Sequence, residues 1–396
     1  MLEDLRPVRT PALVPAETAA LTVNAARERG YLAGRQGLHP AAAPATLAEL
    51  ASAHAGLHAA RLPTPYVTLR SRLPDFDPKE LRNALSPGGG LVKIRTVRRT
   101  LHIYPVAEAA AAHTATLRLR LAATAATVRR LGRQPQVLAR IAPAVRAALA
   151  DGPLGHRQLE QRVLEQPLPI RARRDQHLQL ARLAIKWLWE SGELAYRNTA
   201  DSLHRERREF ALTSLAHPDL RLDDVDEAGA VALLLRRYLS AFGPASIVDF
   251  RWWSGLTQTA ITRAVELLRP DLVNVRVDGI PDSLLLLAED ERGLRTAEPL
   301  PADHVALLAY EDPALKGYFG TRSRYVDDRY RTALFNTIGE ARANITAAAR
   351  CVGVWRFDRH SRTTFVDTFA PLPPAQQRAL VEQVDRMTEF LRSEPS

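Results

Sequence analysis

The segment SPGGGLVKIRTVRRTLHIYPV, residues 86–106, decides the fold predicted for this chain of 396 residues. Its Pro-Gly cluster is typical of a turn, and the alternating and β-branched residues after it predict a strand or hairpin. Short helices are expected upstream, and the last of them starts at Pro65, before the stretch DPKELRNAL at 77–85. Together with the two helices described next, the order is three short helices followed by a β-hairpin, which is the element order of a winged-helix domain. A generic α+β domain has the same order and stays open as an alternative.

Two helices are expected before these elements. Residues 16–38 carry apolar residues at helical spacing and end at Gly37, with Pro40 just beyond, which predicts one helix with a clear stop. In the next helix, at 46–60, Thr46 stands three residues before a glutamate, a capping-box pattern. The apolar face of this second helix is expected to run through Leu47, Leu50 and Leu57.

The order of helices followed by a hairpin recurs along the chain. After an Ala-rich helix at 106–131, three helices precede a second wing at 193–212, and three more precede strand-like runs at 272–279 and 282–290. The remainder predicts strands and a closing helix. We therefore expect an α+β fold of three tandem winged-helix units and a C-terminal β-barrel-like domain, divided as 1–132, 133–225, 226–300 and 301–396.

The amino-acid composition indicates what kind of molecule the protein binds. Of the 54 basic residues 50 are arginines, and the formal net charge is +10, which favours a polyanion such as nucleic acid or an anionic membrane surface. The single Cys351 excludes a disulfide framework within the chain and fits a reducing compartment. No apolar run reaches the length of a membrane span. A soluble, cytoplasmic, nucleoid-associated monomer is expected.

Five phrases, in this order and spacing, resemble one family, the winged-helix DNA glycosylases of the azinomycin-resistance and bacterial crosslink-repair type. They are GRQGL at 34–38, AGLHAARLPTPYVTLRSRL at 55–73, RRTLHIYP at 98–105, RYLSAFGPASIVDFRWWSGL at 237–256 and LLAYEDPALKGYFGTRSR at 307–324. The resemblance implies three winged-helix units around a barrel-like domain, which form a basic channel for duplex DNA. It also implies hydrolysis of the N-glycosidic bond of bulky N7-alkylated purines, as adducts or crosslinks, with self-resistance to a DNA-alkylating natural product as one role.

The resemblance also points to a catalytic position. In the family, a Gln-aliphatic-Gln or Gln-aliphatic-Asp motif follows a Gly-Leu pair and holds the attacking water. Here the motif is His58-Ala59-Ala60, so its second polar side chain is absent. A neutral imidazole can accept a proton from water, which makes His58 the candidate catalytic residue. The alternative is that His58 packs at a helix end in a non-catalytic winged-helix DNA-binding or regulatory protein.

The same phrases supply candidate DNA contacts. Arg98 and Arg99 are candidates for phosphate binding, and Thr100 and His102 for neighbours of the lesion; a solvated wing with locally satisfied side chains is the alternative. Arg35 and Gln36 are candidates too, unless they only tie the first helix to the channel wall. The charge runs at 171–174 and 205–208 are phosphate-binding candidates or solvated faces.

Neither a cofactor nor a metal is expected. His54 precedes His58 by four residues, a spacing that places two imidazoles on one helix face and occurs in metal sites, but no third ligand is evident. The pairs Glu311-Asp312 and Asp327-Asp328 have no pattern that brings them together as a nuclease centre. Trp252 and Trp253 are expected in the core.

Overall fold

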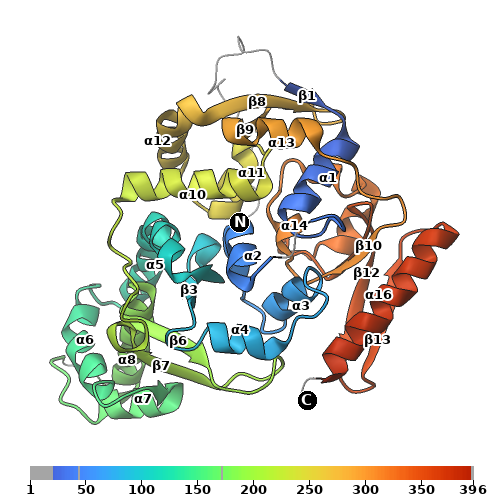
Figure 1. The fold of residues 1–396 in the computed structure, drawn as a ribbon. Coiled ribbons are helices and arrows are strands. Elements are labelled where there is room, and N and C mark those ends of the chain that lie inside the picture. Colours follow the sequence, from blue (N-terminus) through green and yellow to red (C-terminus); the bar gives the residue numbers. More distant parts are fainter. Residues whose placement is uncertain (1–20, 43–44, 171–172, 394–396) are drawn as a thin grey trace.

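The structure is a computed structural model that describes residues 21–42, 45–170 and 173–393 (Figure 1). It is a mixed α+β fold, in which four small sheets are embedded among helices. Three sheets have three strands each and the fourth has four. None of the helices in the described part of the chain combines the length and apolar character needed to cross a membrane.

The hairpin forms within residues 86–106 as predicted, and a helix that was not predicted from the sequence, Pro78–Ala84, precedes it. Three helices precede a hairpin, and the short strand β2 pairs antiparallel with the second hairpin strand, β4. The elements of this first unit are α2 (Leu47–Ala53), β2 (Leu57–His58), α3 (Thr64–Arg70), α4 (Pro78–Ala84), β3 (Leu91–Arg95), η1 (Val97–Arg99), β4 (Leu101–Pro105), η2 (Val106–Glu108) and the long connecting helix α5 (Ala109–Arg130).

Both N-terminal helices are shorter than expected. Of the helix expected at 16–38, residues 16–20 lie outside the described part, and Leu21–Val23 form strand β1, parallel to β8. The helix α1 (Ala25–Arg35) starts only after Asn24, whose side chain caps it by accepting from the Arg27 amide at 2.8 Å. In β1 the first and third side chains are buried and the second is exposed, so strand pairing decides this stretch.

The helix expected at 46–60 begins as predicted and ends early. The Thr46 hydroxyl accepts from the Glu49 amide and the Glu49 carboxylate from the Thr46 amide, which confirms the capping box. However, α2 ends at Ala53, because Ala55 and Gly56 adopt positive φ values of 49° and 99°. Leu57 therefore lies in a strand and not on a helical face.

Two further units follow the same order. The second comprises α6 (Val137–Ala148), β5 (Leu154–Gly155), α7 (His156–Leu164), α8 (Arg174–Glu190), β6 (Leu194–Asn198), β7 (Arg208–Leu212) and α9 (Thr213–Ala216). The third comprises α10 (Glu227–Phe242), α11 (Ile247–Ser254), α12 (Gln258–Leu268), η3 (Arg269–Asp271), β8 (Leu272–Val277), β9 (Leu284–Leu287), η4 (Ala288–Asp290) and α13 (Glu291–Thr296).

The three units share a detail that the sequence does not reveal. In each, a short extended segment between the first two helices pairs antiparallel with the second strand of the hairpin. Strand β2 pairs with β4, β5 pairs with β7, and in the third unit Ala245 bridges to Leu285 of β9. The recurrence therefore extends from element order to strand pairing.

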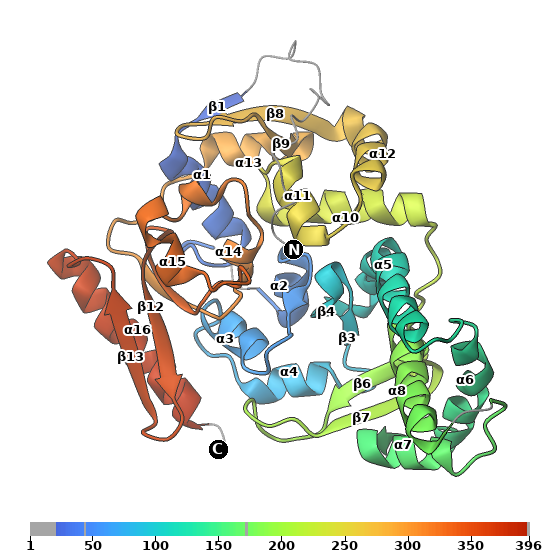
Figure 2. The ribbon, with the colours of Figure 1, turned by 180° about the vertical axis from the view of Figure 1, so that it is seen from behind.

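The C-terminal region forms an open antiparallel sheet in the order β10-β11-β12-β13, and no closed barrel is found among the described residues. The barrel-like domain expected here is therefore not confirmed. Helix α16 contacts β10 and β13, and Figures 1 and 2 show it beside strands β12 and β13. The elements are β10 (Val305–Leu308), α14 (Pro313–Lys316), η5 (Arg322–Arg324), η6 (Asp328–Tyr330), α15 (Arg331–Leu334), β11 (Asn344–Ala347), β12 (Arg350–Asp358), β13 (Thr363–Thr368) and α16 (Pro374–Ser393).

The hydrophobic cores join units that are distant in sequence. Leu50, Leu57 and Leu69 of the first unit share one core with Trp355 and Phe390 of the C-terminal region. The third unit shares a core with α1 and α5, whereas the second unit has its own. The first unit thus lies between the second unit and the C-terminal sheet (Figures 1 and 2). Burial on both sides fixes the backbone on which His58 lies.

Candidate active site

A pair of histidines lies at the centre of the first unit. His58 on β2 is directly opposite His102 on β4, and their rings meet edge to face with centroids 5.2 Å apart. The two residues are 5% and 4% exposed. The β-ladder thus brings together the candidate catalytic residue and one of its predicted neighbours.

Gly56 allows this pairing. Its φ of 99° lies in the region that disfavours residues with a side chain, and a Cβ atom there would lie 2.4 Å from the Tyr104 ring. The tight turn that ends α2 and starts β2 therefore requires glycine. Gly56 therefore helps to hold His58 in place, both through its positive φ and through its close approach to Tyr104.

We expect Gly56→Ala to lower the free energy of unfolding by about 2–3 kcal/mol, since it combines left-handed strain with overpacking. Gly88→Ala is the matched control, because Gly88 also has positive φ but nothing lies within 4 Å of its added Cβ. That control should cost about 1 kcal/mol. Denaturant unfolding of both variants measures the difference, and equal losses would contradict a steric role for Tyr104.

The His58 ring is held in its neutral form. Its Nδ1 atom is buried and has no hydrogen-bond partner. Burial lowers its pKa well below the usual value, and charge on His102, Lys316, Arg61 and Lys93 lowers it further. In the neutral tautomer that carries its proton on Nε2, this nitrogen can accept a hydrogen bond from a donor.

His54 belongs to a different environment. It is the C-terminal cap of α2, and its Nδ1 lies 2.6 Å from the Leu50 carbonyl oxygen. Because α2 ends before His58, the two imidazoles do not share a helix face, contrary to the sequence-based expectation. Among the described residues, no group of three potential ligands is placed to hold a metal ion.

Hydrogen bonds inside the sheet orient His102. The Thr96 hydroxyl lies 3.3 Å from His102 Nδ1 and 2.9 Å from the Tyr104 hydroxyl, and all three side chains are buried. The Thr100 carbonyl oxygen lies 3.4 Å from the same ring nitrogen. Burial lowers the pKa of His102 to about 4. With Nδ1 engaged, the other ring nitrogen is the one that can face a ligand.

Near the His58–His102 pair, three cationic side chains from separate elements surround the indole ring of Trp252. Lys316 Nζ lies 4.9 Å from the Trp252 ring centroid, and the guanidinium carbons of Arg98 and Arg322 lie 4.6 and 4.7 Å from it. Glu311 forms an ion pair with Lys316. Arg322 Nη2 is buried without a hydrogen-bond partner. The cluster has an excess of positive charge, which suits a phosphate group.

The predicted DNA contacts on the hairpin lie at its tip. Arg98 and Arg99 are exposed and have positive φ, and Arg98 donates to the Trp252 carbonyl oxygen at 2.9 Å. Thr100 donates to the Val97 carbonyl oxygen at 3.0 Å. Arg98 thus joins the cation cluster, whereas the Arg99 side chain extends from the tip of the hairpin.

The other two predicted contacts are turned toward the protein interior. Arg35 contacts Tyr31 and Ser240 and forms an ion pair with Asp290. Gln36 is 2% exposed, and its side chain donates to the Ala241 carbonyl oxygen at 3.4 Å. Both side chains tie α1 to α10 and are not brought to His58.

The charged pairs considered from sequence have separate partners. Glu311 binds Lys316, Asp312 binds Arg72, and Asp327 binds Arg329. Of the run at 171–174, residues 171 and 172 lie outside the described part of the chain. In the second run, Arg208 pairs with Glu206. Trp252 and Trp253 are buried, as expected.

Sequence reasoning missed Lys316 and Thr96, and it considered Glu311 only as part of a possible nuclease centre. The phrase at 307–324 that contains Lys316 was noted for its resemblance to the family, but Lys316 itself was not singled out. Lys316 is one of only four lysines in an arginine-rich chain, which is a signal of its own. Thr96 carried no signal, because its role depends on the register of β3 and β4.

The family model described as DNA glycosylase AlkZ-like matches residues 47–390. The chain belongs to this family. The match includes both histidines and all three cations of the cluster, so this AlkZ-like glycosylase carries its site within the family region. A DNA glycosylase acts on DNA, which agrees with the basic composition.

The fold has a solved counterpart. The structure of Streptomyces sahachiroi DNA glycosylase AlkZ is similar, with a TM-score of 0.76 over 94% of this chain and 98% of that chain. The sequences are 19% identical, so the likeness concerns the fold. No curated protein matches this AlkZ-like glycosylase by sequence.

Proposed function

We propose that the protein excises bulky N7-alkylated purines from duplex DNA by hydrolysis of the N-glycosidic bond, with His58 holding the attacking water. The observation that carries this proposal is the buried, unpartnered Nδ1 of His58 beside His102. A water molecule seated there would donate a hydrogen bond to His58. Ala60 is exposed and has no hydrogen-bonding group in its side chain, so the second contact to the water falls to His102 or to the DNA.

The chemistry makes modest demands on these groups. An N7-alkyl purine is cationic and leaves without protonation, so the protein must place a water and stabilise an oxocarbenium-like sugar. Neutral imidazoles suit this task, because an imidazolium would repel both the lesion and the sugar cation. The low pKa values of both histidines keep them neutral at cellular pH.

The positive cluster supports the DNA side of the proposal. We assign Arg98, Lys316 and Arg322 to the phosphates that flank the excised nucleotide, and Arg99 and Thr100 to the backbone farther along. Phosphate contacts of this kind fix the register of a protein on the duplex. For Arg35 and Gln36 the internal contacts favour the alternative role, in which they hold α1 against the wall of the site.

We also propose that the three recurring units are winged-helix modules that line a DNA channel, with divisions near residues 132, 225 and 300. The shared pairing of a short segment with the second hairpin strand supports this. The first module then supplies the catalytic histidine from its short strand. We further propose that the protein acts as a monomer, and that self-resistance to a DNA-alkylating compound is its role.

The proposed function is tested with duplex DNA that carries an N7-guanine adduct. Excision leaves an abasic site, which alkali converts to a strand break that a denaturing gel detects. We expect breaks only after alkali treatment, and more with a bulky adduct than with a methyl group. Absence of breaks with adducts of several sizes would overturn the proposal.

The rate of excision should be independent of pH from about 8 to 6. The pKa of His58 lies well below its usual value of about 6.5, so the neutral form persists as pH falls through that value. Protonation and loss of activity are expected only at lower pH. Single-turnover rates across this range, with circular dichroism to confirm folding, measure the effect. An inflection near pH 6.5 would contradict a buried, neutral His58.

A further inference from the structure

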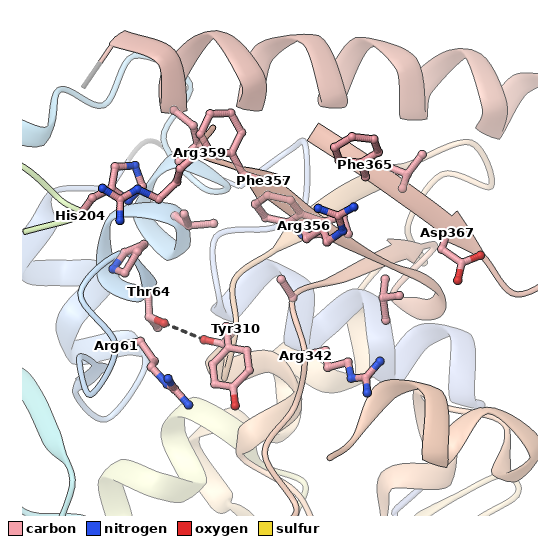
Figure 3. Close-up of a pocket in the computed structure, with 17 residues that line it drawn as sticks. Arg61, Thr64, His204, Tyr310, Arg342, Arg356, Phe357, Arg359, Phe365 and Asp367 are labelled. Carbon is pink, nitrogen blue, oxygen red and sulfur yellow. Dashed lines mark hydrogen bonds between the residues drawn. The ribbon is translucent and has the colours of Figure 1, made fainter. Parts of the chain in front are cut away.

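A cavity of about 770 Å³ opens between the β12–β13 hairpin, the start of α3 and the end of α16 (Figure 3). Neither histidine of the pair lines it. Arg61, three residues after His58, lines the cavity, and its charge is one of those that lower the pKa of His58. The volume falls in the range of ligand-binding sites in proteins.

The charge around this cavity is strongly positive. Four arginines line it, namely Arg61, Arg342, Arg356 and Arg359, against the single carboxylate of Asp367. Within the described residues, no carboxylate pairs with Arg342 or Arg359. Arg61 and Arg356 have partners at 3.7 and 3.6 Å, and both arginines are largely exposed. The positive charge of the cavity lining therefore favours binding of an anion.

Aromatic rings lie among these arginines. Phe365 is 44% exposed, and the Arg356 guanidinium lies 4.2 Å from its ring centroid. Arg61 lies 5.1 Å from the Tyr310 ring. His204 and Phe357 are parallel within 7°, and burial together with the charge of Arg359 lowers the pKa of His204 to about 4, so its ring is neutral. Figure 3 shows these residues around the cavity, on the hairpin and on the segments facing it.

We propose that this cavity binds unpaired nucleotides of a DNA strand, with Arg342 and Arg359 at the phosphates and Phe365 against a base. Arginines interleaved with exposed aromatic faces are the chemistry by which proteins hold single strands without sequence preference. A concave site of this size accommodates individual nucleotides and not a base-paired helix. The protein thereby gains affinity for DNA in which a duplex adjoins a single-stranded segment.

The test compares binding of two undamaged DNAs by fluorescence anisotropy. One is a blunt duplex and the other is the same duplex with a five-thymidine tail, made with either polarity. We expect the full-length protein to bind at least one tailed duplex about tenfold more tightly than the blunt one. The variants Phe365→Ala and Arg342→Ala/Arg359→Ala should each reduce this advantage about tenfold and leave blunt-duplex binding unchanged.

The control is Arg378→Ala, which removes an exposed arginine of α16 that does not line the cavity. This variant should still bind the tailed duplex about tenfold more tightly than the blunt duplex. Equal binding of blunt and tailed DNA, or an advantage that survives in both cavity variants, would overturn the proposal. Since the DNA carries no lesion, either result is independent of whether His58 performs excision.

Discussion

Replacing His58 with alanine should lower the single-turnover rate of base excision about 100- to 1000-fold, the usual effect of removing one preorganised polar group at a reacting centre. The substitution removes the acceptor that holds the water, while Leu57 and the β2–β4 pairing keep the backbone in place. His58→Gln should retain much more activity, because an amide oxygen can also accept from water. Alkali-labile sites per unit time give the rates.

The matched control is His360→Ala, which removes an exposed imidazole from the turn between β12 and β13. Its excision rate should equal that of the unmodified protein. Binding of lesion-containing duplex should be nearly the same for all three variants, so that the loss falls on the chemical step. An unchanged rate in His58→Ala would remove His58 from the mechanism.

Asp312→Ala should lower the free energy of unfolding by about 3–5 kcal/mol, because it leaves a buried guanidinium without its counter-ion. Arg72 donates to both carboxylate oxygens of Asp312, at 3.0 and 2.7 Å, and both side chains are fully buried. Arg72 also donates to the Gln36 and Thr68 carbonyl oxygens. The pair joins α1, α3 and α14, and α14 carries Lys316.

Asp271→Ala is the control for this prediction, since Asp271 pairs with Arg236 at 2.8 Å but is 55% exposed. It should cost about 1 kcal/mol or less. The double variant Arg72→Met/Asp312→Leu should recover part of the loss, because no charge is left buried. Denaturant midpoints compare the three. Similar losses for Asp312→Ala and Asp271→Ala would contradict the assigned burial of the pair.

Local sequence signals predicted the elements of each unit well. Capping residues such as Thr46 and the turn glycines before β3 mark boundaries that depend only on neighbouring residues. The prediction was wrong where tertiary contacts decide. Leu21–Val23 form a strand because β8, some 250 residues later, offers an edge. The C-terminal strands were foreseen, but whether a sheet closes depends on pairing between distant strands.

The candidate site divides in the same way. His58 could be proposed from the sequence because a family motif marks it. Its position opposite His102 could not be proposed, because it depends on strand β2, and residues 57 and 58 were expected to be helical. The cation cluster could not be derived, since Arg98, Lys316 and Arg322 converge on Trp252 from three separate elements. These three side chains come together only when the chain folds.

The central claim is that a water held at His58 cleaves the glycosidic bond. The Lys316 amine, which forms an ion pair with Glu311, is an alternative nucleophile. Incubation with lesion-containing duplex in the presence of borohydride distinguishes them, because borohydride traps an amine bound to the sugar as a covalent protein–DNA complex. The account predicts free modified base, an intact abasic strand and no trapped complex. A trapped complex that disappears in Lys316→Arg would contradict it.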